Sequence, residues 1–300
     1  MFALHRYEDD MPTGWRPPVV IPYGSDESQL GTSLGGDGEG IQWGPDYGVV
    51  APDGTWWILD SAKRRFAHYG AAGDYLGQVT IPSEHLVDGR FAQWQHPLAL
   101  ADGTIVTFRM SGDRTILLLL REGTFGEVGL DRQVAVKADD GELLYGFGAD
   151  GELLAVDPTN GTIAEVGAFR SRTGEHYRLA RDGSDLVFEL PDRNVSRIWP
   201  QVTPETGAPA AGAISLATTT DGRFHVLIDG AAEDEEQTGR AGYGVIDLQG
   251  SLTSTEPTRD PWSPSDGGTG SRLVARPGAV ELWFITVDGD AVRLYQRVWS

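Results

Sequence analysis

Asp-Gly dipeptides recur along the chain between short apolar runs, and this feature limits the possible folds more than any other. Those expected at the first turn of successive units begin at residues 53, 102, 140, 182 and 221, and a Pro-Gly takes this place at 277, which gives spacings of 49, 38, 42, 39 and 56 residues. Asp-Gly between two apolar runs is typical of a tight β-hairpin, because glycine tolerates positive φ. The chain is therefore expected to consist of repeated units of antiparallel strands.

The stretch of residues 47–82 shows what one unit contains. Three turn signals separate four short runs, which are Tyr47–Ala51, Thr55–Leu59, Arg65–Tyr69 and Tyr75–Ile81. They predict a four-stranded antiparallel sheet. A lone sheet of this size cannot bury its faces in water, so copies of it should stack on one another. Four-stranded units with a period of about 45 residues are typical of the blades of a β-propeller.

Six such units follow one another, and the last of them lacks a strand. We expect blades over residues 47–82, 97–130, 133–168, 176–209, 213–255 and 272–300. The apolar run at residues 17–22 has no hairpin partner nearby, so it is expected to supply the missing strand. The sequence thus predicts an all-β fold in one domain, residues 17–300, as a six-bladed β-propeller closed by its N-terminal strand. Residues 1–16 are expected to form a polar arm, and residues 200–212 and 252–271 leave room for a seventh, irregular blade.

Charge and composition exclude several classes of protein. A formal net charge of −20 at pH 7 opposes binding to phosphate backbones, so nucleic acid is not an expected partner. The longest apolar run, residues 116–120, is far shorter than the roughly 20 residues of a membrane helix, so no membrane insertion is expected. If Met1 is the native start, acidic residues stand where a signal peptide has its apolar centre, which favours a cytoplasmic protein or a part of an assembled particle. The absence of cysteine excludes disulfides and thiolate zinc sites.

The first unit resembles the blades of the NHL repeat family of β-propellers. Such blades pair a Pro-Asp-Gly turn with a following Asp-Ser and with an Arg that precedes an aromatic residue. The matching positions here are Pro52-Asp53-Gly54, Asp60-Ser61, Arg64 or Arg65, Phe66 or Tyr69, and Gly73 with Leu76-Gly77. The resemblance covers about one blade, so it implies the architecture and no particular ligand. Asp60 and one of the two arginines are expected to form a structural ion pair.

Candidate binding residues stand in the loops that should lead into the innermost strands, where propeller ligands usually lie. They are Trp43, Asp46, Trp94, His96, His176 and Trp262. Aromatic side chains on a rigid ring can form a platform for sugar rings or for a partner protein. Histidines and carboxylates that meet at one channel mouth can instead bind a divalent cation, whose bound water serves hydrolysis or elimination. The histidines show no metal-ligand spacing, so we expect no cofactor and keep a channel cation as the alternative.

Two groups of propeller enzymes can be compared with that alternative. The calcium-dependent lactonase group uses Asn together with Asp or Glu as ligands, whereas Asn160 and Asn194 fall in expected outer turns of this chain. The peptide-amidating lyase group uses channel histidines with Arg and Tyr, which His96, His176 and Tyr177 match only in part. We therefore expect a non-catalytic module for recognition or assembly, with a protein or glycan partner, such as a subunit of a phage or injection-machine tail. The alternative is a metal-dependent hydrolase or lyase with its site at the channel mouth.

Overall fold

The computed structural model describes most of the chain between residues 16 and 299. The described residues are 16–31, 33–34, 41–43, 45–86, 97–182, 185–199, 214–218, 222–229, 240–249, 251–259, 268–276, 279–287 and 291–299. The chain divides into two compact units, and each is treated by itself. One unit comprises residues 1–19, 177–286 and 294–300, and the other comprises residues 20–176 and 287–293.

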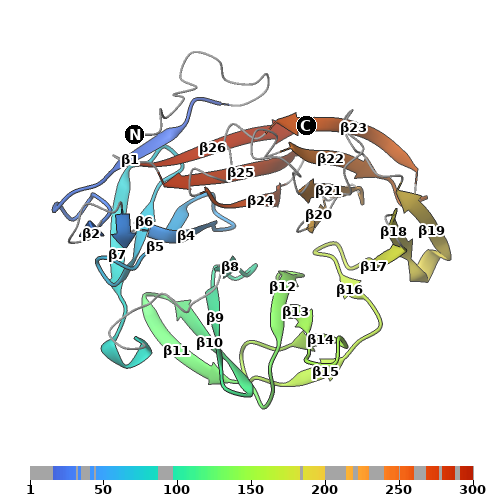
Figure 1. Cartoon of the computed structure of the whole chain (residues 1–300), viewed down its shortest axis with the longest axis horizontal. Coiled ribbons are helices and arrows are strands. Elements are labelled where there is room, and N and C mark those ends of the chain that lie inside the picture. Colours follow the sequence, from blue (N-terminus) through green and yellow to red (C-terminus); the bar gives the residue numbers. More distant parts are fainter. Residues whose placement is uncertain are drawn as a thin grey trace. The chain divides into compact units, whose positions relative to one another are not determined.

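Strands make up almost all regular structure in these residues, so the predicted all-β class is confirmed. The exceptions are two short 3-10 helices, η1 (Ser83–His85) and η2 (Pro191–Arg193). The described strands form six four-stranded sheets and one two-stranded sheet. In five of the four-stranded sheets the strands follow their order in the chain, as an up-and-down meander (Figure 1). That is the strand order of a propeller blade.

The first three four-stranded sheets lie in the unit that contains residues 20–176. The first sheet contains β4 (Pro45–Val50), β5 (Trp56–Asp60), β6 (Arg65–Tyr69) and β7 (Tyr75–Thr80). The second contains β8 (Leu98–Ala99), β9 (Ile105–Ser111), β10 (Arg114–Arg121) and β11 (Thr124–Gly129). The third contains β12 (Ala135–Asp139), β13 (Leu144–Phe147), β14 (Leu153–Val156) and β15 (Ile163–Glu165). All of these strand pairs are antiparallel, as predicted.

The remaining strands form three further four-stranded sheets and a small ribbon. The fourth sheet contains β16 (Phe169–Arg170), β17 (His176–Asp182), β18 (Asp185–Leu190) and β19 (Val195–Trp199). The fifth contains β20 (Ile214–Thr218), β21 (Phe224–Asp229), β22 (Arg240–Ile246) and β23 (Leu252–Arg259). The sixth contains β24 (Gly268–Arg276), β25 (Ala279–Val287), β26 (Ala291–Trp299) and β1 (Val19–Pro22). The ribbon pairs β2 (Ser33–Leu34) with β3 (Ile41–Trp43).

The sixth sheet takes its fourth strand from the start of the chain. Its order is β1-β26-β25-β24, so the strand expected from residues 17–22 lies beside the last strand. Just before β1, the Arg16 backbone N–H donates to the Gln296 carbonyl at 2.8 Å, and the Arg16 guanidinium donates to the Gln296 side-chain oxygen at 2.9 Å. The number of blades in a ring and its closure by β1 stay predictions.

One type of turn joins many of the strands. In each of five turns the first residue's N–H donates to the fifth residue's carbonyl at 2.8–2.9 Å, and the glycine at the fourth position donates to the first residue's carbonyl at 2.9–3.1 Å. These glycines have φ between 82° and 92°, the left-handed conformation of a three-residue hairpin loop that ends in a bulge. The five turns are residues 51–55, 70–74, 100–104, 148–152 and 171–175.

The last of these turns corrects the predicted start of the fourth unit. We expected that unit to begin at His176 with Asp182-Gly183 as its first turn, whereas its first strand is β16 and its first turn is residues 171–175. Asp182 ends β17, so the Asp-Gly dipeptide stands at the second turn of the sheet. The first turn contains Thr173-Gly174, so its glycine adopts the left-handed conformation although no Asp-Gly dipeptide marks the turn.

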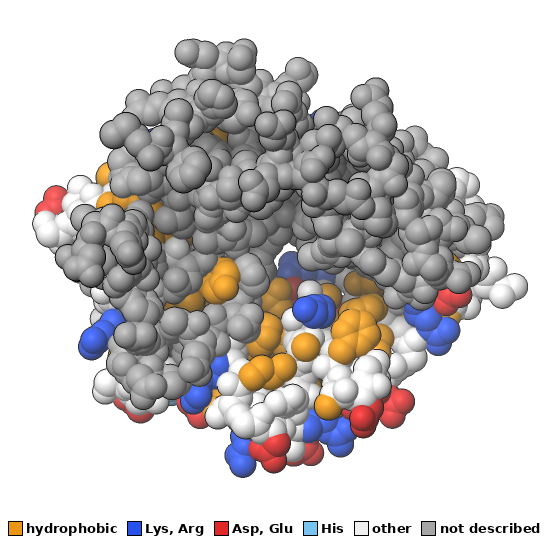
Figure 2. All heavy atoms as spheres, viewed as in Figure 1, with side chains coloured by type: hydrophobic (Ala, Val, Ile, Leu, Met, Phe, Trp, Pro, Cys, Tyr) orange, Lys and Arg blue, Asp and Glu red, His pale blue; other side chains and the backbone are white. Residues whose placement is uncertain are grey.

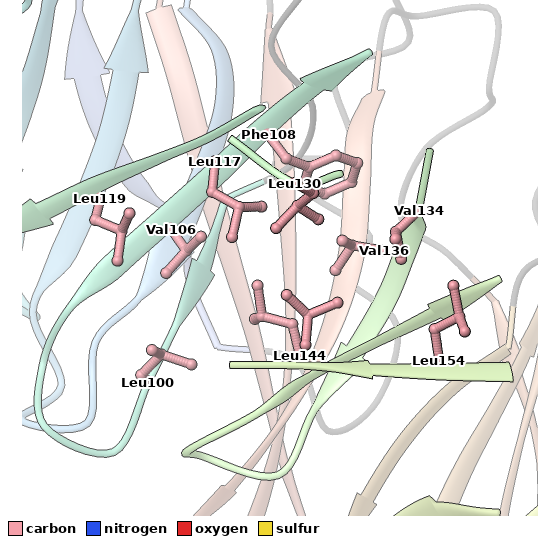
Figure 3. Packing of buried hydrophobic residues seen from close by; sticks show 11 residues of the cluster. Leu100, Val106, Phe108, Leu117, Leu119, Leu130, Val134, Val136, Leu144 and Leu154 are labelled. Carbon is pink, nitrogen blue, oxygen red and sulfur yellow. The ribbon is translucent and has the colours of Figure 1, made fainter. Parts of the chain in front are cut away.

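The hydrophobic core lies between neighbouring sheets. One cluster joins the first and second sheets through residues such as Leu59, Phe66 and Leu118. The next joins the second and third sheets and contains Leu117, Leu130 and Leu144 (Figure 3). Both faces of the second sheet are therefore covered, which explains the nearly continuous apolar run in β10.

Candidate functional site

Most of the predicted binding residues lie where the structure gives no side-chain geometry. Trp94, His96 and Trp262 lie outside the described residues. Trp43 ends β3 and Asp46 lies within β4, so both stand in strands and not in the loop expected before the first innermost strand; only their backbones are described. Their roles stay predictions.

His176 is the one predicted site residue with a described side chain, and its predicted place was wrong. It is exposed and begins β17, the second strand of its sheet, directly after the turn 171–175. It therefore stands at the end of the sheet where the innermost strand finishes, and not in a loop that leads into that strand. The displacement follows from the missed Thr173-Gly174 turn.

A buried ion pair holds the first sheet together, as predicted for Asp60. Arg65 is its partner: the Arg65 Nε donates to the Asp60 Oδ2 at 3.0 Å, and both side chains are almost completely buried. The same Asp60 oxygen accepts from the Gly31 N–H at 3.0 Å, and the other oxygen accepts from the Lys63 N–H at 3.2 Å. Both oxygens of the Asp60 carboxylate thus accept structural hydrogen bonds.

The other donors of this cluster hold a segment that we call the strap, residues 26–31. The Arg65 guanidinium donates to the Glu27 carbonyl at 2.7 Å, to the Gln29 carbonyl and to the Gln78 side chain. The Lys63 Nζ donates to the Asp26 and Gln29 carbonyls at 2.6 and 2.8 Å. Burial and the neighbouring Arg65 guanidinium lower the pKa of Lys63. These bonds make the cluster a fastening for the strap, which is a structural role.

A second polar group surrounds His68 at the other end of the first sheet. The Thr55 hydroxyl donates to the Asp53 Oδ1 at 2.7 Å and lies 2.8 Å from the His68 Nε2. Because the hydroxyl proton goes to Asp53, the His68 Nε2 is the donor to Thr55. The His68 ring is stacked on Trp57, with centroids 4.1 Å apart and an angle of 7°. Burial lowers the pKa of His68, although Asp53 opposes the shift.

This Asp-Thr-His arrangement does not have the geometry of an activated nucleophile. A hydroxyl that attacks a substrate must hand its proton to the base, whereas here the carboxylate receives it and the imidazole donates to the hydroxyl. A comparable arrangement occurs in the second sheet, where Arg121 donates to the Thr104 hydroxyl at 3.0 Å and to Asp102 at 3.2 Å. Because the arrangement recurs, we infer that it stabilises the turns of both sheets.

Two exposed apolar side chains lie where the second and third sheets meet. Met110 near the end of β9 and Phe147 at the end of β13 are 40% and 38% exposed, which is unusual for large apolar side chains among the described residues. They stand at the same end of the two sheets, because the Val134 N–H donates to the Thr115 hydroxyl at 2.8 Å and Ala135 pairs with Phe147. That hydroxyl also lies 3.2 Å from the Met110 sulfur.

Two arginines flank this end of the second sheet, since Arg114 begins β10 and the Arg132 carbonyl accepts from the Thr115 N–H at 3.0 Å. Arg114 and Arg132 are more than half exposed; Arg114 lies 4.0 Å from an Asp113 oxygen, and Arg132 lies 3.6 Å from an Asp131 oxygen and 3.8 Å from a Glu152 oxygen. We call the four residues Met110, Phe147, Arg114 and Arg132 the Met110–Phe147 surface. On the face drawn in Figure 2, hydrophobic side chains gather over the strands around β9, β12 and β13, while acidic side chains lie farther out.

Tyr145 and Arg170 show how the opposite ends of these strands are arranged. The Tyr145 hydroxyl donates to the Asp140 Oδ2 at 2.9 Å, and the Arg170 Nη1 lies 3.5 Å from the same oxygen. Burial, together with this hydrogen bond, raises the pKa of Tyr145, so its proton stays in place. Arg172 donates to the Ala99 carbonyl at 2.8 Å and to Asp139 at 2.6 Å, which ties a turn of the fourth sheet to the second and third.

Neither a metal centre nor a membrane span is found in the part of the chain that the structure describes. Among those residues, no three or more His, Asp or Glu side chains are grouped as ligands of a metal ion. Within the same limits, no helix reaches the length and hydrophobicity that crossing a bilayer requires.

Comparison with solved structures finds similarities to several proteins. A streptogramin B lyase structure has 12% sequence identity and a TM-score of 0.47, covering 92% of this chain and 92% of that chain. Virginiamycin B lyase from Staphylococcus aureus has 10% identity and a TM-score of 0.45, covering 84% and 94%. Regucalcin, a calcium-binding protein from Agrobacterium tumefaciens, has 13% identity and a TM-score of 0.40, covering 83% and 89%. At these values the similarities say nothing about the activity of this chain, and the fold rests on its strand order.

Comparison with sequences and families gives one assignment. No curated protein sequence matches this chain significantly. A family model does match, over residues 13–297, which is nearly the whole chain and all six four-stranded sheets except the end of β26. The chain therefore belongs to the family described as Domain of unknown function (DUF7485).

Proposed function

We propose that this chain is a recognition or assembly module built on a six-bladed, NHL-like β-propeller that β1 closes. The succession of four-stranded meanders and the place of β1 beside β26 support the architecture. The partner is a protein, with a glycan as the second class, and the protein works in the cytoplasm or in an assembled particle. The net charge of −20 makes nucleic acid an unsuitable ligand.

The Met110–Phe147 surface is the observation that carries the binding role. Methionine, aromatic residues and arginine are the side chains enriched at protein interfaces, and this surface combines all three. Phe147 stands edge-on to Phe169, with centroids 6.0 Å apart, so its ring is held rather than loose. A packed aromatic ring beside a flexible thioether, with two arginines and their neighbouring carboxylates around them, is suited to a partner surface with an apolar centre and a polar rim.

Aspartate substitutions test this role. Met110→Asp and Phe147→Asp should each prevent capture of the partner from extracts of the source cells and weaken its binding once it is purified. Leu76→Asp is the matched control, because Leu76 is 50% exposed but lies in β7 of the first sheet. A glycan array with the same variants distinguishes a sugar ligand from a protein. A partner that binds the Met110 and Phe147 variants as tightly as the wild type would contradict the proposal.

A metal-dependent hydrolase or lyase with its site at a channel mouth is the competing function. Elemental analysis of the purified protein, with melting curves recorded with and without a chelator, tests it directly. The recognition role predicts that His96→Ala and His176→Ala leave binding intact, whereas Trp262→Ala weakens it. A stoichiometric metal whose removal lowers the melting temperature, with activity lost in the histidine variants, would favour the enzyme.

A further inference from the structure

His68 lies in a cross-strand row that is missing one side chain. The row runs Val49, Trp57, His68 and Gly77 across β4, β5, β6 and β7. Trp57 covers one face of the His68 ring, with an interplanar angle of 7°. On the other side stands Gly77, and the space where its side chain would begin contains no atom within 4 Å. No side chain of β7 at this position therefore covers the outer side of the ring.

The backbone at Gly77 keeps this position open. Its φ is 152°, within the range that side-chain-bearing residues rarely adopt, and the register of β6 and β7 shifts just beside it, between His68 and Tyr69. A bulge next to a glycine in an outer strand thus leaves a gap as wide as one side chain. Cross-strand neighbours in a sheet stand about 5 Å apart, which is enough for one planar group beside the imidazole.

The charge around the gap is negative. The two turns at this end of the sheet, residues 51–55 and 70–74, carry Asp53 and Asp74 and no Lys or Arg. Both aspartates are exposed. His68 itself is neutral at pH 7, because burial lowers its pKa and its Nε2 proton is donated to Thr55. A neutral ring near the Asp53 carboxylate, at an end of the sheet whose turns carry Asp53 and Asp74, favours a planar cation. The guanidinium of arginine is planar and stacks on aromatic faces.

We propose that the gap beside His68 binds an arginine side chain of a basic partner protein, with the guanidinium stacked on the imidazole and close to Asp53 and Asp74. The site rests on the recognition role proposed above but not on the Met110–Phe147 surface, which belongs to the opposite ends of the strands of other sheets. Stacking requires a planar cation, so arginine should bind better than lysine at equal charge.

Labelled hexa-arginine and hexa-lysine peptides provide the probe, with binding to the full chain measured by fluorescence anisotropy at low salt. The wild type should bind hexa-arginine about two- to five-fold more tightly than hexa-lysine. His68→Phe keeps the ring and should keep this preference, whereas His68→Gln keeps a donor for Thr55 and should lose it. Asp74→Asn should weaken both peptides to a similar degree, because it removes charge and not the ring.

The outcomes separate this site from the proposed surface. Equal binding of the two peptides, or no binding, overturns the arginine site, as does a preference that survives His68→Gln or disappears in His68→Phe. Met110→Asp should leave the preference unchanged, so failure of one proposal does not imply failure of the other. Melting curves of each variant show that a loss of binding is not a loss of fold.

Discussion

Asp60→Asn is the substitution whose consequence is best defined by the structure. The Asp60 Oδ2 accepts from both the Gly31 N–H and the Arg65 Nε at 3.0 Å, so an amide NH2 at that place would face two donors. If the amide turns over, its NH2 faces the Lys63 N–H instead. In either orientation a buried guanidinium loses its counter-charge.

The cost can be estimated from the burial of the pair. Removing one partner of a buried ion pair costs about 3–5 kcal/mol. An unfolding entropy of about 2.1 cal/mol/K per residue gives roughly 0.6 kcal/mol/K for a chain of this length, so the melting temperature should fall by about 5–8 °C. Differential scanning calorimetry and urea unfolding followed by tryptophan fluorescence measure the two quantities independently.

Two further variants make the experiment specific to the buried pair. Asp113→Asn is the control, because its carboxylate is 96% exposed and lies 4.0 Å from the Arg114 Nε; its melting curve should match the wild type. Arg65→Gln should release the strap and make the chain cleavable after Glu27 by a glutamate-specific protease. The double variant should cost less than the two single variants together, since they remove the same bond. A wild-type melting curve for Asp60→Asn would refute the reasoning.

Three other predictions concern a turn, a titration and the N-terminal strand. Gly103→Ala, at φ 84°, should lower the free energy of unfolding by about 1–3 kcal/mol, whereas Gly126→Ala, in open space without positive φ, should change it little; urea unfolding distinguishes them. Folding lowers the pKa of His68 from 6.5, so the unfolded chain binds more protons than the folded chain just below that pH. The free energy of unfolding should therefore fall as the pH drops through 6.5 towards the lowered value. His68→Gln should flatten this part of the pH profile. Deletion of residues 1–22 should lower the melting temperature sharply, because it removes the strand beside β26, and an unchanged melt would contradict closure by β1.

The strands of the first three sheets could be predicted closely because local signals and tertiary packing agree there. The runs expected at Arg65–Tyr69 and Tyr75–Ile81 are β6 and β7 to within a residue. Asp60 was correctly expected in a structural ion pair, and the structure selects Arg65 because β5 and β6 place the two residues opposite each other. The fourth sheet was shifted by one strand because its first strand has only two residues and its turn lacks Asp-Gly.

The polar contacts around the first sheet could not be predicted from the sequence, for a different reason. Residues 24–42 have the composition of a loop, and nothing in them indicates that part of the segment is fixed by Arg65 and Lys63. The gap beside His68 depends on a register shift in β7, which composition does not reveal. The Met110–Phe147 surface combines the ends of two strands in different sheets, so only the packing of those sheets brings its residues together.

The strap has a consequence for how this chain can vary. Four consecutive carbonyl oxygens, those of Asp26, Glu27, Ser28 and Gln29, accept hydrogen bonds from Lys63, Arg65 and Tyr69. Every residue type has that carbonyl, so these bonds depend on the path of the main chain. The exposed bond from the Gln78 side chain to the Glu27 carboxylate, at 3.0 Å, is the side-chain contact that a substitution at position 27 would remove. The donors that fix the strap lie some 35 residues farther along the chain. Most variants in a library randomised at positions 26–28 should therefore keep the fold. This segment would then be a practical place to insert new binding loops.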